Sequence, residues 1–331
     1  MSLSSMPAAL LVAAALCASI MGYAIQRGGT CTVAAVDEWL TQRRASRLAA
    51  MLEASLWVAG GLLLAMQFGA LAVLPRGAAL TAWTVLGAAL LGLGAVINKA
   101  CVFGTVARWG QGEWAYLATG LGFYWGGWIA DRVMPSAQLP TAAGPSPSAL
   151  SMAPGLALLL LGLFGIWRLR GLLPGTGRAA DGAQRPRPGD TTGWWNPHSA
   201  TAAIGITFVA LWLLVGSAWA YTDVLVDWSR GVHRDGLLRL TLLLCLLGGA
   251  LWGGRHTAMR RPGLGSPVAW LRCLAGGLLM GLGSVLIPGS NDGLILLGMP
   301  LLLPHAWLAF AVMCLSIATG LGMQRRWAPR R

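Results

Sequence analysis

Runs of apolar residues long enough to cross a bilayer recur along the whole chain, and they constrain its fold more than any other feature. A membrane-spanning helix needs about 20 predominantly apolar residues. About nine such runs are present, and we place them near residues 7–25, 54–74, 79–97, 114–133, 153–169, 201–221, 237–252, 266–287 and 303–322. The chain is therefore predicted to be an all-α polytopic membrane protein.

The scarcity of charge supports this prediction. Only 11% of the 331 residues are charged, whereas a soluble domain carries about 25%. So little polar surface cannot cover a water-soluble globule, which excludes a soluble enzyme, a disordered chain and a nucleic-acid-binding domain despite the net charge of +13. The first run has no Lys or Arg before Arg27 and so lacks the charged start of a signal peptide. We expect it to be retained as the first span.

The basic residues predict the orientation. Cytoplasmic loops of membrane proteins are enriched in Lys and Arg. With the N-terminus outside, 18 of the 24 basic residues fall on the inner side, and the 135–152 linker outside carries none. These 18 are Arg27, Arg43, Arg44, Arg47, Lys99, Arg108, Arg168, Arg170, Arg178, Arg185, Arg187, Arg255, Arg260, Arg261, Arg325, Arg326, Arg330 and Arg331. The pattern predicts an outside N-terminus and a cytoplasmic C-terminus.

A short internal repeat relates the two halves of the chain, with one copy in each half. The stretch from Gly92 to Gly104 matches the stretch from Gly281 to Gly293 at a constant offset of 189, which aligns Cys101 with Ser290. The first copy ends a span that travels inward and the second a span that travels outward, as in transporters built from inverted repeats. We expect halves 1–150 and 151–331, with a solvated cytoplasmic linker at 170–198.

Segments near the repeat are too polar or too interrupted to span a bilayer. They are 98–112, 288–300 and 27–40. Non-helical backbone is tolerated at membrane depth only where it is buried in protein or lines a cavity. We therefore predict short re-entrant helices here, and 216–228 is a candidate counterpart of 27–40, although no alignment supports it.

Two of these segments present a thiol. Gln26, Thr30 and Cys31 lie in a glycine-rich turn that lets backbone approach a ligand; the alternative is a turn with a packed cysteine. Lys99 precedes Cys101 closely enough to favour its thiolate or to attract an anion. Alternatively, Lys99 is a positive-inside anchor beside a buried thiol.

The second copy and the flanking amides complete the candidate site. Gly289 to Gly293 has the composition of a turn, and its equivalence to the Cys101 segment makes Ser290 and Asn291 candidates. Asn98, which lies three residues before Cys101 in the first copy, is a further candidate. No CxxC pair, histidine cluster or ATP-binding motif occurs, so no metal and no cofactor are expected.

The motifs from Gly22 to Thr32, from Gly92 to Gly104 and from Gly276 to Gly293 resemble the YeeE/YedE family of bacterial sulfur transporters. The resemblance implies thiosulfate uptake across the inner membrane through an hourglass of helices, in which short re-entrant helices meet at a narrow waist. Cys31 and Cys101 match cysteines that bond the sulfur end of thiosulfate in that family. Ser290 stands where the second copy usually has cysteine, and a further second-half thiol lacks a counterpart near 216–228 unless Cys245 serves.

The leading hypothesis is transport of a small sulfur-containing anion rather than catalysis. The expected pathway residues are Cys31, Cys101, Ser290, Asn98, Lys99, Asn291, Gln26 and Thr30. The alternative is a membrane-embedded sulfurtransferase or redox enzyme with Cys31 or Cys101 as nucleophile, and a third is a structural membrane subunit. The resemblance also implies a small cytoplasmic sulfur carrier of the TusA type, which would dock on the basic inner face formed by Arg178, Arg185, Arg187, Arg255, Arg260 and Arg261.

Overall fold

The computed structural model describes residues 7–71, 75, 77–133, 154–170, 194–232, 235–255, 262–287 and 289–327. Within these ranges the protein is helical, and the only β-pairing is a single bridge between Glu113 and Gly263. The 135–152 linker, the boundary at 150, most of the 170–198 linker, and Arg178, Arg185, Arg187, Arg260, Arg261, Arg330 and Arg331 lie outside the described residues.

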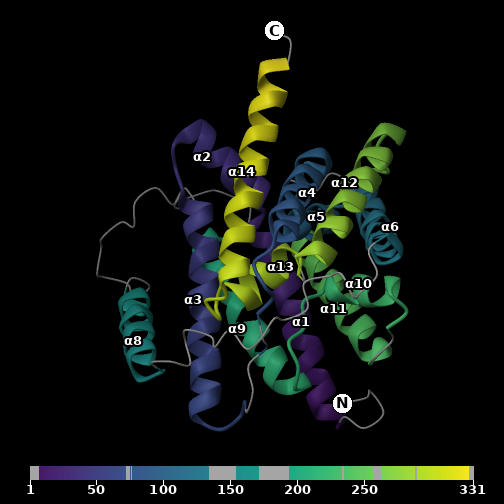
Figure 1. The fold of residues 1–331 in the computed structure, drawn as a ribbon. Coiled ribbons are helices and arrows are strands. Elements are labelled where there is room, and N and C mark those ends of the chain that lie inside the picture. The colour runs from purple at the N-terminus through teal and green to yellow at the C-terminus, as the bar shows by residue number, and fades with distance from the viewer. Residues whose placement is uncertain are drawn as a thin grey trace.

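Among the described residues, nine long helices overlap the nine predicted runs (Figure 1). They are α1 (Ala8–Gly28), α3 (Ser46–Gln67), α4 (Ala82–Asn98), α6 (Leu117–Val133), α8 (Pro154–Arg170), α9 (Pro197–Val215), α11 (Gly236–Arg255), α12 (Pro267–Leu286) and α14 (Pro304–Trp327). Among the described residues, seven helical segments are long and apolar enough to cross a membrane. The other two long helices, α6 and α8, have 17 residues each. The all-α membrane fold is thus confirmed, while the count of nine spans stays a prediction.

Local sequence determines where several long helices begin. Asn196 caps α9, since its side chain accepts a hydrogen bond from the His198 amide at 3.0 Å. Ser266 caps α12 by accepting from the Ala269 amide at 3.2 Å. A proline follows each cap, where its missing N–H removes no helical hydrogen bond.

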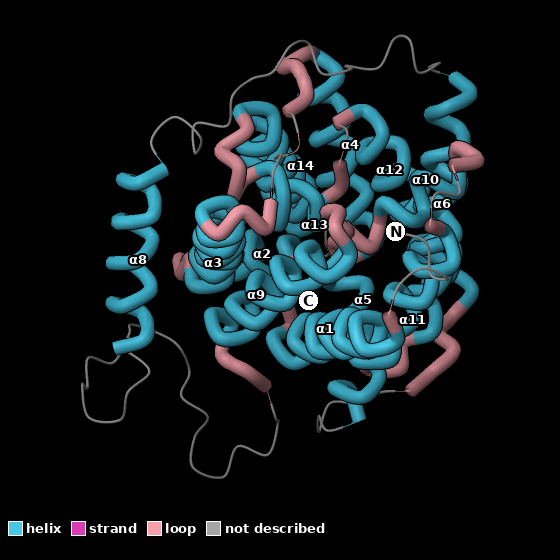
Figure 2. Tube along the Cα trace, turned by 90° about the horizontal axis from the view of Figure 1, so that it is seen from below, coloured by secondary structure: helices cyan, strands magenta, loops and turns pink. Residues whose placement is uncertain are grey.

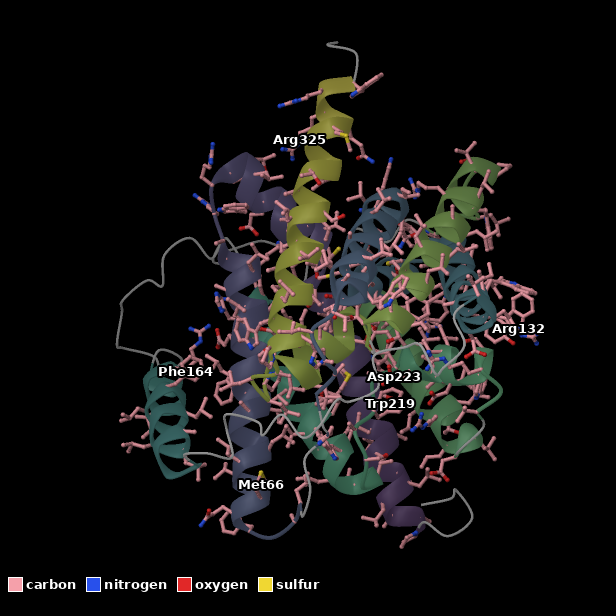
Figure 3. The ribbon with its side chains drawn as sticks, in the orientation of Figure 1. Met66, Arg132, Phe164, Trp219, Asp223 and Arg325 are labelled. Atoms are coloured by element: carbon pink, nitrogen blue, oxygen red, sulfur yellow. The ribbon has the colours of Figure 1, made fainter. Side chains whose placement is uncertain are left out.

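The helices run in alternating directions. In Figures 1 and 3, α1 begins at the lower end, α3 returns toward it with Met66 near the bottom, and α14 ends at the top with Arg325. Close contacts make α3 parallel to α9, α1 parallel to α11, and α4 parallel to α14 but antiparallel to α12.

Glycines bring α12 close to its neighbours α4 and α6. An added Cβ at Gly277 would lie 2.2 Å from the Thr119 carbonyl oxygen, and one at Gly281 would lie 2.1 Å from that of Phe123. Apolar lipid gives helices no hydrophobic reason to associate, so close backbone packing of small residues supplies much of the attraction. This packing holds α6 against α12 along most of its length.

Four of the long helices are each followed by a short helix, from which a few non-helical residues separate them. The short helices are α2 (Thr32–Gln42), α5 (Val102–Gly110), α10 (Asp223–Ser229) and α13 (Asn291–Gly293), which continues into a π-helical turn, η3 (Leu294–Gly298). A further short turn, η2 (Trp114–Tyr116), precedes α6. The predicted interrupted segments therefore contain short helices, and Figure 2 shows α13 near the middle of the bundle while α8 stands at its edge.

Candidate functional site

The starts of the four short helices meet inside the bundle. The residue that precedes each helix is Cys31 for α2, Cys101 for α5, Thr222 for α10 and Ser290 for α13. Each of these four is buried, with Cys31 the most accessible at 8%. The chain thus brings together four polar side chains that are far apart in sequence.

One side of this centre consists of thiols. The free thiols of Cys31 and Cys101 lie close together, since Cys31 Sγ packs against Gly104 of α5 and Cys101 directly precedes that helix. The Thr32 amide at the start of α2 donates to Cys101 Sγ at 3.1 Å. Helix N-termini carry a partial positive charge and unpaired N–H groups. The Cys101 sulfur atom therefore lies at the N-terminal end of α2, and Cys31 directly precedes that helix.

The other side consists of oxygen atoms. The Thr222 hydroxyl donates to Asp292 Oδ1 at 2.6 Å and lies 2.5 Å from Ser290 Oγ. The Ser290 hydroxyl also donates to Asp292 Oδ1, and the Thr222 amide donates to Asp292 Oδ2 at 3.3 Å. Asp292 is completely buried. A carboxylate thus lies at the centre of the protein.

Two contacts join the thiol side to the oxygen side. The Asn291 amide donates to the Thr32 hydroxyl at 3.1 Å, and the rings of Phe103 and Tyr221 meet edge to face with centroids 6.0 Å apart. We refer to the polar residues on both sides as the central cluster. Its members are Cys31, Thr32, Cys101, Thr222, Ser290, Asn291 and Asp292.

Asn98 and Lys99 lie beside this cluster and differ from each other in orientation. The buried Asn98 amide donates to the Ala100 carbonyl at 2.8 Å and to the Thr105 hydroxyl at 3.0 Å, and its oxygen accepts from Thr119 at 2.9 Å. It therefore holds the turn that presents Cys101. Lys99 adopts a left-handed conformation at the end of α4 with an exposed side chain, so it is not a member of the cluster.

Gln26 and Thr30 are buried polar residues without a partner. Both amide atoms of Gln26 and the Thr30 hydroxyl lack hydrogen bonds within the part of the chain that the structure describes. Gln26 is fully buried and Thr30 is 7% exposed. An unsatisfied buried polar group costs free energy, so such groups are ready to bind water or a ligand.

A small pocket leads from the surface to Cys31. It is lined by Gly28, Gly29, Thr30, Cys31, Arg47, Ala50, Met51, Pro197 and Thr201. These residues come from the end of α1 and the starts of α3 and α9. The pocket therefore connects a thiol and an unpartnered hydroxyl with the end of the bundle where α1 ends.

Sequence reasoning missed three members of the cluster, Thr32, Thr222 and Asp292. The offset of 189 from Cys31 leads to Ala220, two residues short of Thr222, and the flanking residues do not match. Asp292 lies in the segment from Gly289 to Gly293, whose composition predicts a turn and does not mark the carboxylate as a site residue. Cys245, the other candidate for a second-half thiol, lies within α11, and Thr222 takes the position in the centre instead.

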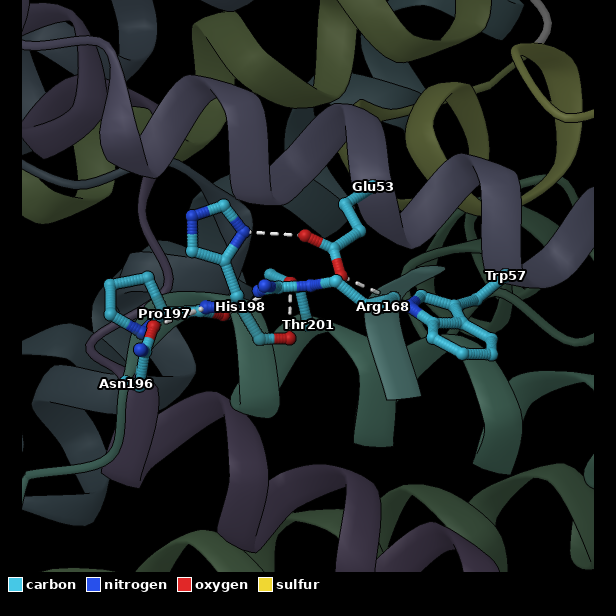
Figure 4. A network of polar contacts seen from close by, with 7 residues as sticks. All are labelled: Glu53, Trp57, Arg168, Asn196, Pro197, His198 and Thr201. Carbon is cyan, nitrogen blue, oxygen red and sulfur yellow. Dashed lines mark hydrogen bonds and ion pairs between the residues drawn. The ribbon is translucent and has the colours of Figure 1, made fainter. Parts of the chain in front are cut away.

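A second polar network lies between α3, α8 and α9 (Figure 4). Glu53 accepts hydrogen bonds from Arg168 Nε at 2.7 Å, from His198 Nδ1 at 2.5 Å and from the Trp57 indole at 3.3 Å. Glu53 is only 7% exposed. Because every partner donates to the carboxylate, the network neutralises a charge inside the helical bundle. Among the described residues, no group of three or more His, Cys, Asp or Glu side chains is arranged to hold a metal ion.

Comparison with known proteins shows which proteins this chain resembles. The sulphur transport family matches the chain over residues 27–319. A thiosulfate transporter, TsuA of Spirochaeta thermophila, is 28% identical over 254 residues, which cover 68% of this chain and 72% of that protein. The family and this relative are transporters and not enzymes, which agrees with the function expected from the sequence. Since the match covers most of its length and includes all four segments that form the centre, the chain belongs to the sulphur transport family.

Proposed function

We propose that the protein imports a small sulfur-containing anion, most specifically thiosulfate, across the bacterial inner membrane through the central cluster. Family membership and the name of the Spirochaeta relative support a sulfur anion as substrate. One structural observation carries the proposed route. Two neighbouring free thiols lie at the start of α2, where the Thr32 amide donates to Cys101 Sγ at 3.1 Å and Cys31 lines a surface pocket.

This arrangement suits an anion that must leave water. Removing its hydration shell is costly unless other donors replace the lost hydrogen bonds. Helix N-termini provide fixed N–H groups without a mobile charge, while thiols are weak donors that hold an ion without trapping it. The unpartnered Gln26 amide and Thr30 hydroxyl add two buried groups beside the same route.

We further propose that the two halves, 1–150 and 151–331, are inverted copies of one unit. The offset of 189 relates α1 to α9, α2 to α10, α3 to α11, α4 to α12, α5 to α13 with η3, and α6 to α14, with boundaries that differ by a few residues. The paired long helices run in opposite directions, since α3 is parallel to α9 and α1 to α11. The α8 helix opens the second half and has no counterpart in the first.

The N-terminus is proposed to lie outside and the C-terminus in the cytoplasm. Arginines gather at the end of the bundle where α14 ends. They lie in the α2–α3 connection, in the last turn of α11 and in the last turn of α14. The pocket that reaches Cys31 includes Arg47 and opens near this face. A TusA-like carrier docked there would receive the sulfur species as it leaves the route.

Uptake into proteoliposomes tests the function. Purified protein should import labelled thiosulfate in preference to sulfate, sulfite and selenite, because the thiols favour a polarisable sulfur end. Cys101→Ala should abolish uptake, whereas Cys273→Ala, which removes a buried thiol on α12 outside the cluster, should preserve it. Normal uptake by Cys101→Ala would remove this thiol from the route.

Mass spectrometry separates transport from the rival sulfurtransferase function. A nucleophilic cysteine that accepts sulfur from the substrate would carry a stoichiometric persulfide after exposure to thiosulfate. For a transporter that only hydrogen-bonds the ion, Cys31 and Cys101 should stay unmodified while uptake proceeds. A persulfide on either thiol in most molecules would favour the enzyme.

A further inference from the structure

We propose that Asp292 binds a proton that crosses the membrane together with the anion, so that the protein works as an anion–proton symporter. This inference rests on the transport function proposed above and adds to it the coupling ion and the residue that carries it. Three features of the central cluster support it.

The first feature is that Asp292 is a buried carboxylate without a positive partner. Its side chain is fully buried, and among the described residues no Arg, Lys or His forms an ion pair with it. By contrast, Glu53 is paired with Arg168, and Asp227 with Arg239. An ionised group inside a membrane protein is costly unless paired, and an exception indicates a functional site.

The second feature is the number of hydrogens in the cluster. Thr222 Oγ1, Ser290 Oγ and Asp292 Oδ1 form a triangle in which all three pairs are in contact. Three hydrogen bonds around this ring need three protons, but the two hydroxyls supply only two. With the carboxylate ionised, both hydroxyls donate to Asp292 Oδ1 and no proton remains for the contact between Thr222 and Ser290. A protonated Asp292 can donate to one hydroxyl, which then becomes free to donate to the other, so that each oxygen donates once and accepts once.

The third feature is the charge of the groups around Asp292. Asp223 and Tyr221 lie within electrostatic range of Asp292, and Tyr221 lies within the same range of Cys31 and Cys101. All four of these groups are neutral or negative, and the cation Arg108 on α5 lies within range of Cys31 on the thiol side. An ionised Asp292 would repel an anion held at the thiols only one contact away, whereas the protonated acid would not.

The transport cycle follows from these features. On the outer side, the Asp292 carboxylate accepts a proton from water and becomes a carboxylic acid. The anion then binds at the N–H groups and thiols, and both ions leave on the inner side, where the proton returns to water. Because each proton offsets one negative charge of the anion, symport reduces the work of moving that anion against an inside-negative potential.

Proton flux in proteoliposomes tests the proposal directly. With the membrane potential clamped by valinomycin and potassium, an inward thiosulfate gradient should acidify the lumen, as measured with a trapped pH-sensitive dye. An inside-alkaline pH difference of one unit should raise thiosulfate accumulation about tenfold if one proton accompanies each anion. Thiosulfate uptake by the wild type without luminal acidification would overturn the coupling and leave the transport function intact, whereas failure of uptake itself would refute that function.

Substitution assigns the coupling to Asp292. Asp292→Asn keeps the size and an accepting oxygen of the side chain but cannot bind and release a proton, so the uptake that the variant retains should proceed without luminal acidification and should not respond to the pH difference. Asp292→Glu should restore acidification. The matched control is Asp37→Asn, which removes a surface carboxylate paired with Arg325 and should leave coupling unchanged. Coupling that survives Asp292→Asn would overturn the assignment, as would equal loss of coupling in Asp37→Asn.

Discussion

At the scale of single residues, the thiol side of the centre depends on the small size of Gly104. A Cβ at this position would lie 2.5 Å from Cys31 Sγ and 3.0 Å from Cys31 Cβ. Contacts shorter than about 3 Å between such atoms cannot form without movement. Only glycine therefore lets α5 approach Cys31 closely enough for the two thiols to lie side by side.

Gly104→Ala should accordingly displace Cys31 and reduce thiosulfate uptake at least tenfold, while the protein still reaches the membrane. Uptake and yield of the purified protein measure the two effects. Gly120→Ala is the control, since an added Cβ there meets nothing within 4 Å, and it should transport normally. Equal activity of the two variants would show that this contact is not required.

Ser290 permits a second prediction at this scale. A thiol is softer and more polarisable than a hydroxyl, and it interacts better with sulfur than with oxygen. Ser290→Cys should therefore raise the ratio of thiosulfate uptake to sulfate uptake several-fold, as measured by competition in proteoliposomes. A fall in this ratio would indicate that the serine, through its contacts with Thr222 and Asp292, favours the oxygen end of the ion.

The sequence predicts some residues of the centre and not others, for a physical reason. Cys31, Cys101 and Ser290 follow recognisable breaks in apolar runs, and the last two also align with each other. Thr222 and Asp292 gain their importance only through contacts across 68 and 70 positions of the chain. No local pattern records such pairings. Lys99, by contrast, lies two residues before Cys101, which made it a candidate, but its side chain is exposed in the fold.

At the scale of helices, the largest difference from the sequence prediction concerns α3. Its apolar run was placed at 54–74, whereas the helix spans Ser46–Gln67. Hydropathy moves the predicted start past Glu53 because a charge counts against a span. In the structure Arg168 and His198 bond that carboxylate, so the helix includes it.

The same network predicts how α8 is attached. Removing one partner of a buried ion pair leaves the other charge uncompensated. Glu53→Gln should therefore destabilise the protein by about 3 kcal/mol and lower its midpoint of thermal unfolding in detergent. The double variant Glu53→Gln with Arg168→Met removes the orphaned charge and should recover part of the loss. If the double variant were less stable than the single one, the ion pair would not be the source of the effect.

At the scale of the whole molecule, orientation is open to direct measurement. Phe68 follows α3 and is 82% exposed, while Trp327 ends α14 and is 86% exposed. The proposed topology places Phe68 outside and Trp327 in the cytoplasm. A membrane-impermeant maleimide should label Phe68→Cys in intact spheroplasts and Trp327→Cys only after permeabilisation. The unsubstituted protein controls for its native thiols, and the reverse pattern would invert the topology.

The two-sided composition of the central cluster has a consequence for any ion that passes it. Sulfur atoms lie on one side and oxygen atoms on the other, and Thr32 and Asn291 link the two sides. An ion with one sulfur end and one oxygen end, such as thiosulfate, would turn to match this polarity and cross in a single alignment. Sulfate is the same in every direction and would gain nothing from turning. The centre thus distinguishes ions by their internal asymmetry as well as by their size and charge.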